Sequence, residues 1–122
     1  MKFLCLAYEE QKALDDLSHD EWQALRAETL AYVEVLRNSG HLILTHALQS
    51  ARTAETVRVH EAAPRVVDGP YAETKEQLGG FFLIEARDMR QAVELASRWP
   101  SARFGSVEVR PIEEELRDER RY

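Results

Sequence analysis

His46 and Asp68 are a histidine and an aspartate, the residue types that proton transfer often uses. A carboxylate beside an imidazole holds the ring in one tautomer and raises its pKa, which makes it a useful general base near neutral pH. The pair is therefore a candidate acid/base site, with His46 as the base and Asp68 as the residue that orients it. Simpler roles stay open: a core or interface histidine bonded to a carbonyl, and an aspartate that stabilises its own turn.

Asp68 also opens the stretch DGPYAETKEQLGGFFLIEA, residues 68–86, whose first three residues are strong turn formers. The charged segment that follows is longer than the two residues that suffice to join antiparallel strands. Ordered loops of this kind are often functional. We predict a ligand-binding loop, with Lys75 suited to an anionic group; the candidate residues are Tyr71, Glu73, Thr74 and Lys75. The alternative is a plain connection whose charges are solvated.

Arg58 is a further candidate for ligand binding, because its strand could flank the same opening. The alternative is an edge-strand charge that discourages aggregation. A shared metal site at His41 and His46 is excluded, because residues five apart on a strand face opposite sides. The chain has no cysteine–histidine cluster with zinc spacing and no phosphate-binding glycine motif, so we expect neither metal nor cofactor. Cys5 is expected to be an inert core thiol.

Six strands and two helices must position these residues. The helix over His19–Asn38 begins at the capping box Ser18-His-Asp-Glu21 and ends at Gly40. A second helix is capped by Asp88, with Gln91 at the reciprocal position, and stops at Pro100. Strands are predicted over residues 3–8, 41–48, 55–60, 65–67, 80–86 and 106–110. Residues 73–78 favour a helical turn, which Gly79 would end at positive φ.

The predicted order is therefore β-α-β-β-β-β-α-β. Without the hairpin of the third and fourth strands, the pattern βαββαβ remains, which is that of a ferredoxin-like α+β domain. Both helices would then cover one face of an antiparallel sheet. We predict one domain over residues 1–112, followed by a charged tail, 113–122, that is a frayed helical turn or disordered.

The strands predict an assembly, because they are apolar on both faces. Phe81 and Leu83 alternate with Phe82 and Ile84, where a sheet with one wet face would alternate apolar and polar residues. The first strand has the same pattern, and in the second strand Leu42, Leu44 and His46 are predicted to share a face. Two helices cover only one face, so we predict that a second copy covers the other. A curled sheet covered by its own hairpin is the alternative.

Composition excludes several classes of protein. The net charge of −6 argues against general nucleic-acid binding and against attraction to an anionic membrane surface. No apolar run approaches the roughly 20 residues of a membrane span. The single cysteine allows no disulfide within the chain and suits a reducing compartment, so we expect a cytoplasmic protein.

The stretch DGPYAETKEQLGGFFLIEARD and the later GSVEVRP closely resemble the YCII-related, DGPF-domain family, with Tyr71 in place of the phenylalanine of that name. The resemblance covers nearly the whole chain. It implies a ferredoxin-like fold with dimeric α/β-barrel assembly, and bacterial genes that often lie beside or are fused to extracytoplasmic-function sigma factors. It also implies a His–Asp pair proposed to be catalytic in some relatives, one of which is similar to a dehydrochlorinase of aromatic degradation.

Two functions follow as expectations, and a purely structural dimeric domain without a ligand stays open as a third. The first is a small-molecule site in a dimeric barrel, with lyase-like acid/base chemistry at His46 and Asp68. The second is a non-catalytic module that binds a ligand or a protein in sigma-factor signalling. A closed pocket with a residue of perturbed pKa would favour the first, and an exposed apolar patch beyond the dimer interface would favour the second.

Overall fold

The computed structural model describes residues 1–113 and residue 121. The helices of this part are α1 (Gln11–Asp15), α2 (His19–Asn38) and α3 (Met89–Ser97), with short 3₁₀ turns η1 (Ala51–Thr53) and η2 (Pro100–Phe104). The strands are β1 (Lys2–Glu10), β2 (Leu42–Ala47), β3 (Glu55–His60), β4 (Ala63–Asp68), β5 (Glu76–Glu85) and β6 (Gly105–Pro111). The tail predicted over residues 113–122 lies outside the described residues, apart from its first residue and residue 121.

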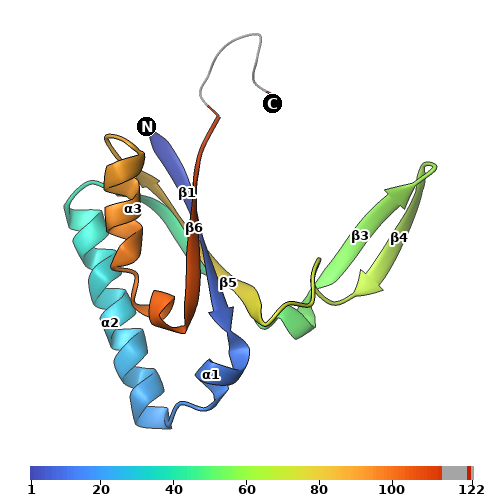
Figure 1. Ribbon diagram of the computed structural model, residues 1–122, viewed down its shortest axis with the longest axis horizontal. Helices are drawn as coiled ribbons and strands as arrows, with labels where there is room; N and C mark the ends of the chain where they lie inside the picture. Colours follow the sequence, from blue (N-terminus) through green and yellow to red (C-terminus); the bar gives the residue numbers. More distant parts are fainter. Residues whose placement is uncertain (114–120, 122) are drawn as a thin grey trace.

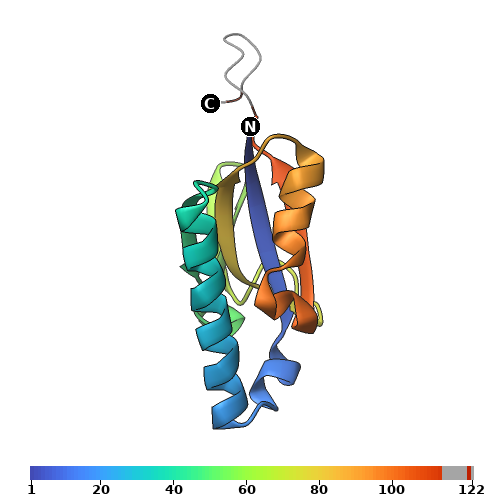
Figure 2. The same cartoon turned by 90° about the vertical axis from the view of Figure 1, so that its left-hand side faces the viewer.

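Four strands form an antiparallel sheet in the order β2-β5-β1-β6, which is the ferredoxin-like arrangement expected for βαββαβ. Helices α2 and α3 both cover one face of this sheet (Figure 2). Strands β3 and β4 pair only with each other, as a hairpin inserted between β2 and β5. The hairpin projects away from the body of the molecule (Figure 1). The predicted fold is thereby confirmed.

The core lies between the sheet and the two helices. Phe3, Cys5, Phe82 and Ile84 point from β1 and β5 toward the helices and are fully buried. The Phe82 ring stacks on Trp99, with the ring centroids 4.2 Å apart. The helix-covered face is therefore a continuous apolar layer, built by every second residue of the central strands.

The predicted helix ends are confirmed. Ser18 Oγ accepts from the backbone N–H of Glu21, and the Glu21 carboxylate accepts in return from the N–H of Ser18. Gly40 follows α2 with φ of 81°, a conformation that glycine adopts without strain. At α3, Asp88 caps as predicted, but the Gln91 side chain accepts from the N–H of Arg87 rather than of Asp88.

The helical turn predicted over residues 73–78 is wrong. Strand β5 already begins at Glu76, because Glu76, Gln77 and Leu78 pair with the end of β1. Gly79 is the extra residue of a bulge at this point rather than a helix stop, and only Gly40 and Gly69 among the glycines have positive φ. Pairing with a neighbouring strand outweighed the local helical preference of the charged segment.

The face assignment predicted for β2 is also wrong in part. A register shift between Leu42 and Leu44 places Leu42 opposite Ile84, on the helix-covered face. Leu44 and His46 lie opposite Leu83 and Phe81, on the other face. One extra residue in a strand moves all following side chains to the opposite side.

The face of the sheet away from the helices is called the outer face here. Its side chains on β1 and β5 are half-buried, and Leu44 is 43% exposed. Its apolar and aromatic residues are Leu4, Leu6, Tyr8, Leu44, His46, Leu78, Phe81 and Leu83, and on β6 it carries Ser106, Glu108 and Arg110. No described element of the same chain covers this apolar surface. Its burial by a second copy stays a prediction.

Candidate functional site

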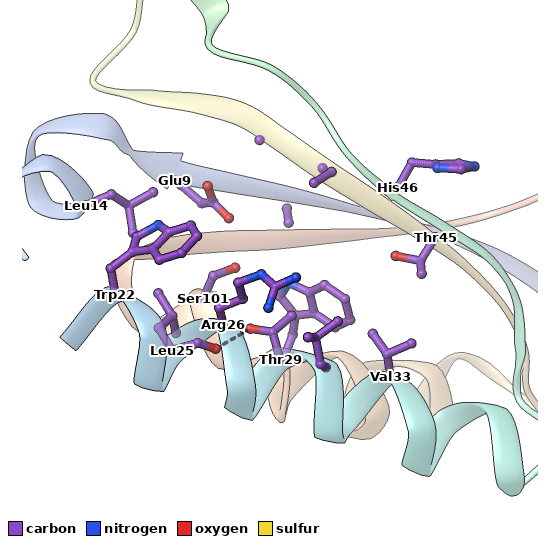
Figure 3. Close-up of a pocket in the computed structure, with 16 residues that line it drawn as sticks. Glu9, Leu14, Trp22, Leu25, Arg26, Thr29, Val33, Thr45, His46 and Ser101 are labelled. Carbon is purple, nitrogen blue, oxygen red and sulfur yellow. Dashed lines mark hydrogen bonds between the residues drawn. The ribbon is translucent and has the colours of Figure 1, made fainter. Parts of the chain in front are cut away.

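A pocket of about 380 Å³, called the helix pocket here, lies between α2 and the helix-covered face of the sheet. Its floor comes from β1, β2 and β5, and its wall from one side of α2 (Figure 3). Most lining side chains are apolar, and the polar side chains directed into it are few. Concave, mainly apolar pockets with a small number of polar groups are typical of small-molecule sites.

Helix α2 presents a regular row of side chains to this pocket. Trp22, Arg26, Thr29 and Val33 follow at spacings of four, three and four residues, which places them on one side of a helix. The Thr29 hydroxyl donates to the carbonyl of Leu25, at 2.8 Å (Figure 3). The Arg26 guanidinium extends from the helix toward the sheet (Figure 3).

Glu9 is the ionisable group of the pocket on the sheet side. It lies opposite Gly105 near the end of β1 and continues the helix-facing series of Phe3, Cys5 and Ala7. Burial raises the pKa of its carboxyl above the ordinary value, and the nearby Ser101 hydroxyl lowers it in part. The two groups do not reach hydrogen-bond geometry, and Ser101 Oγ is buried without a partner. A carboxyl in this setting changes protonation closer to neutral pH than an exposed one.

Gly79 makes room for this carboxyl, and Gly80 makes room for the backbone of the neighbouring strand β2. A Cβ atom on Gly79 would overlap Glu9 Oε2 and lie 2.8 Å from Glu9 Cδ. A Cβ atom on Gly80 would lie 3.0 Å from the backbone oxygen of His46 in the neighbouring strand. Gly79 and Gly80 are therefore part of the pocket, where the sequence predicted a helix stop at Gly79.

The aromatic walls of the helix pocket are Trp22 and Trp99, the two tryptophans of the chain. Trp99 is buried, whereas Trp22 is 48% exposed. Indole faces favour flat, apolar ring systems. Together with Glu9 and Arg26, they suit a planar ligand that carries an ionisable group.

His46 contributes little to this pocket. Its ring lies on the outer face, tilted against Phe81 with the ring centroids 6.0 Å apart. Figure 3 shows the His46 side chain directed away from the other lining residues. Asp68 lies at the end of β4, opposite Glu55 in the hairpin. Within the described residues no hydrogen bond joins His46 to Asp68, so their catalytic role remains a prediction.

The loop after Asp68 lines a second pocket of about 800 Å³, called the loop pocket here. Tyr71 and Thr74 line it, as does Thr56 at the base of the hairpin. The Arg58 guanidinium lies 5.4 Å from the centroid of the Tyr71 ring, so these two predicted residues meet in a cation–π contact.

The other two predicted loop residues point elsewhere. Lys75 lies 3.7 Å from the Glu10 carboxylate, and neither Lys75 nor Glu73 lines the loop pocket. Their part in ligand binding remains a prediction.

Glu9, Trp22 and Arg26 were missed by the sequence prediction. Glu9 carried a usable signal, because it shares the parity of three residues whose alternation placed them on a single face. A carboxyl among the alternate strand residues that face the core costs free energy on burial, so its presence there suggests a function. Trp22 was recognised only as part of the apolar side of a helix.

No group of three or more potential metal ligands occurs among the residues that the structure describes. None of the described helices is both long and apolar enough to span a membrane.

Comparison with known proteins agrees with this architecture. The family model of the YCII-related domain matches residues 1–116. An uncharacterised protein of Rhizobium meliloti (strain 1021) is 32% identical over 114 residues, which is 92% of each chain. The structure of 5-chloro-2-hydroxyhydroquinone dehydrochlorinase from Burkholderia phenoliruptrix AC1100, bound to 2,5-dihydroxybenzoquinone, superposes with a TM-score of 0.57 at 17% identity. That likeness spans 93% of this chain and 94% of the other and shows a shared fold. The chain belongs to the family of YCII-related domain proteins.

Proposed function

We propose that this protein binds a small, planar organic molecule in the helix pocket and that Glu9 exchanges a proton with it. The observation that carries the proposal is the Glu9 carboxyl itself, set into an apolar pocket where burial raises its pKa. Perturbed carboxyls in pockets are the usual mark of acid/base sites. Gly79 leaves space for this carboxyl, because a side chain at that position would overlap it.

The remaining lining residues suggest how a ligand would be held. Trp22 and Trp99 offer aromatic surfaces to a flat ring, and Arg26 offers a cation to an acidic substituent. Glu9 would accept a proton from the ligand when ionised and return it when protonated. This is the chemistry of an isomerisation or of an elimination, which agrees with the lyase-like reaction predicted from the sequence. The fold neighbour supports the ligand class, since its bound molecule is a dihydroxylated quinone.

Nuclear magnetic resonance tests this function directly. The probe is 2,5-dihydroxybenzoquinone together with a set of hydroxylated aromatic acids, titrated into the ¹⁵N-labelled protein. We expect shifts of backbone amides around Gly79, Trp22 and Ala7. Shifts confined to the loop pocket would refute the helix pocket as the site, and so would their absence with every probe.

Proton exchange is tested by calorimetry of any binding probe in two buffers of different ionisation enthalpy. The difference gives the number of protons taken up or released. We expect this number to fall toward zero in Glu9→Gln and to be unchanged in Glu10→Gln. Glu10 is the matched control, because it is the next residue of β1 and faces the opposite side, toward Lys75.

His46 and Asp68, the predicted acid/base pair, could act together only if two copies of the chain associate. Asp68 belongs to the hairpin and His46 to the outer face, so a second copy is the means by which the two could meet. The test is the His46 ring spectrum of Asp68→Asn, recorded at concentrations where the protein is dimeric. A spectrum identical to the native one would eliminate the pair.

The loop pocket supports a second ligand site. Its predicted members Tyr71 and Arg58 are in contact, and Thr74 shares the same cavity. Glu73 and Lys75, which do not line this pocket, would have to turn toward it to take part in binding. The amide titration described above separates the two pockets, because the residues lining them are almost entirely different.

A non-catalytic module in extracytoplasmic-function sigma-factor signalling is the alternative function. The exposed valines of the hairpin favour protein binding of some kind. Gel filtration of the purified protein with a purified sigma factor from the same genome tests it. Co-elution at micromolar concentration would support this alternative, and independent elution would count against it.

A further inference from the structure

The β3–β4 hairpin is exposed along almost its whole length. Of its twelve strand residues, only Thr56 is even partly buried. Its hydrogen bonds to the adjoining chain lie near its base, where the Gly69 N–H donates to Ala54 O and the Thr56 hydroxyl donates to Gly69 O, and further along β3 the Arg58 guanidinium lies over the Tyr71 ring. A two-stranded hairpin without further packing is at best marginally stable in water. We therefore expect the hairpin to pack against a surface outside its own chain.

The two faces of the hairpin differ in chemistry. Val57 and Val66 are directly opposite each other, as are Val59 and Pro64, and these four form what we call the valine face. Val57 is 61% exposed, Val66 59% and Val59 69%. A contiguous apolar face on a projecting element marks a protein contact.

The opposite side, called the arginine face here, carries Arg58 and Arg65 as a directly opposed pair, with His60 beside them. Neither arginine forms an ion pair with a described residue. Burying two adjacent unpaired cations is costly, and like charges opposed across strands repel. The valine face is therefore the side that docks, and the arginine face stays in water.

The hairpin projects on the side of the outer face. In Figure 1 the helices lie on one side of the sheet and the hairpin on the other, and Figure 2 shows the helices in front of the sheet. The valine face and the outer face are thus two exposed apolar surfaces of one chain, and the hairpin that carries the first extends on the side of the second. A partner seated on the outer face would meet the hairpin as well.

We propose that the partner is a second copy of this chain and that the hairpin of each copy is an arm that packs its valine face on the other. Twofold pairing through the outer faces would bury the outer face and the valine face of both copies at once. In such an isologous interface, both copies use the same surface. A different protein would need two complementary surfaces of its own.

The area also favours an arm. A sheet face of four strands of this length measures about 500 Å², taking strand spacing and rise per residue at their usual values. A stable interface buries about 800 Å² on each partner. The hairpin adds about 200 Å² by the same strand dimensions, which enlarges the flat area of the joint surface to about 700 Å².

Sedimentation equilibrium of paired variants tests the arm. The double variant Val57→Thr, Val59→Thr keeps β-branched side chains in β3 but makes the valine face polar. The matched control is Val67→Thr, which changes an equally exposed valine on the arginine face. We expect the dimer dissociation constant to rise by about tenfold or more in the double variant, from the loss of buried methyl groups, and by less than twofold in the control.

Hydrogen exchange gives a second, independent measurement on the unaltered protein. Amides of β3 and β4 should exchange slowly at concentrations where the dimer forms and quickly on dilution below its dissociation constant. A dimer whose affinity is the same in both variants, with fast-exchanging hairpin amides, would overturn the arm while leaving sheet-to-sheet pairing intact. A protein that stays monomeric at high concentration would overturn both, and a hairpin protected only by a different protein would overturn the second copy as its partner.

Discussion

At the scale of single residues, Glu9 ties the helix pocket to the stability of the fold. Its pKa in the folded protein is raised by burial, so the folded state binds its proton more tightly than the unfolded chain does. The favourable contribution of protonated Glu9 is complete below its ordinary pKa of 4.5, and it is lost as pH rises through the higher folded value. At neutral pH the ionised carboxyl is therefore a net cost.

Glu9→Gln should for this reason be more stable than the native protein at pH 7. The gain should shrink as the pH is lowered toward 4, because the native carboxyl then becomes neutral too. Urea unfolding of both proteins at the two pH values measures the difference. A gain that did not change with pH would show that the carboxyl is not desolvated in the folded state.

Two glycine substitutions are expected to distinguish an effect on ligand binding from an effect on the stability of the fold. Gly79→Ala places its Cβ against the flexible end of the Glu9 side chain, which can turn away. We expect the variant to fold with little loss of stability but to lose most of its affinity for probes of the helix pocket. Gly105→Ala is the contrasting variant, since its Cβ overlaps the backbone oxygen of Tyr8, and overpacking of this kind costs about 1–3 kcal/mol. Thermal unfolding and amide titration of both variants measure the two effects; equal destabilisation would contradict the distinction.

Cys5 offers a further residue-level prediction. It is fully buried in the core, and burial raises the pKa of its thiol to about 12. Because the thiolate is the reactive form, the native protein should not react with a disulfide reagent such as DTNB on the minutes timescale. Reaction should follow global unfolding in urea. Fast reaction of the native protein would mean that the sheet opens locally at β1.

At the scale of elements, the sequence predicts most of the fold because its signals are local. The capping box of α2 and the apolar periodicity of β1 each identify an element from a few neighbouring residues. The predictions were wrong where contacts with residues distant in the sequence determine the local structure. The start of β5 depends on pairing with β1, and the faces of β2 depend on a bulge that no residue type announces. The helix pocket was missed for the same reason, since it joins residues from distant elements.

The N-terminal cap of α2 lies one turn before Trp22, which lines the helix pocket. Ser18→Ala removes the hydroxyl that accepts from the Glu21 N–H, and lost caps cost about 1 kcal/mol. We expect that loss in urea unfolding, and fraying at His19 and Asp20 in hydrogen exchange. Ser18→Asp is the control, because a carboxylate caps the same N–H and should retain most of the stability. Loss of stability by both variants would assign another role to Ser18.

At the scale of the whole molecule, the two surfaces proposed to have a function lie on opposite sides of one sheet. The helix pocket opens on the side of α2, whereas the outer face and the arm are directed to the other side. Strand β2 connects them, because Thr45 faces the pocket while its neighbours Leu44 and His46 face outward. Burial of the outer face would thereby hold the pocket floor in place. Pocket and outer face are thus linked through the strands, and His46 belongs to both.

Leu83→Glu tests this view of the molecule, because Leu83 lies in the middle of the outer face between Leu4 and Leu44. A carboxylate there would be buried without a partner in a dimer but solvated in a monomer. We expect light scattering after gel filtration to show a folded monomer. Val93→Glu on the exposed side of α3 is the control and should leave the dimer intact. If the Leu83→Glu monomer binds helix-pocket probes several-fold more weakly than the dimer, assembly supports the pocket through β2; unchanged affinity would make the two surfaces independent.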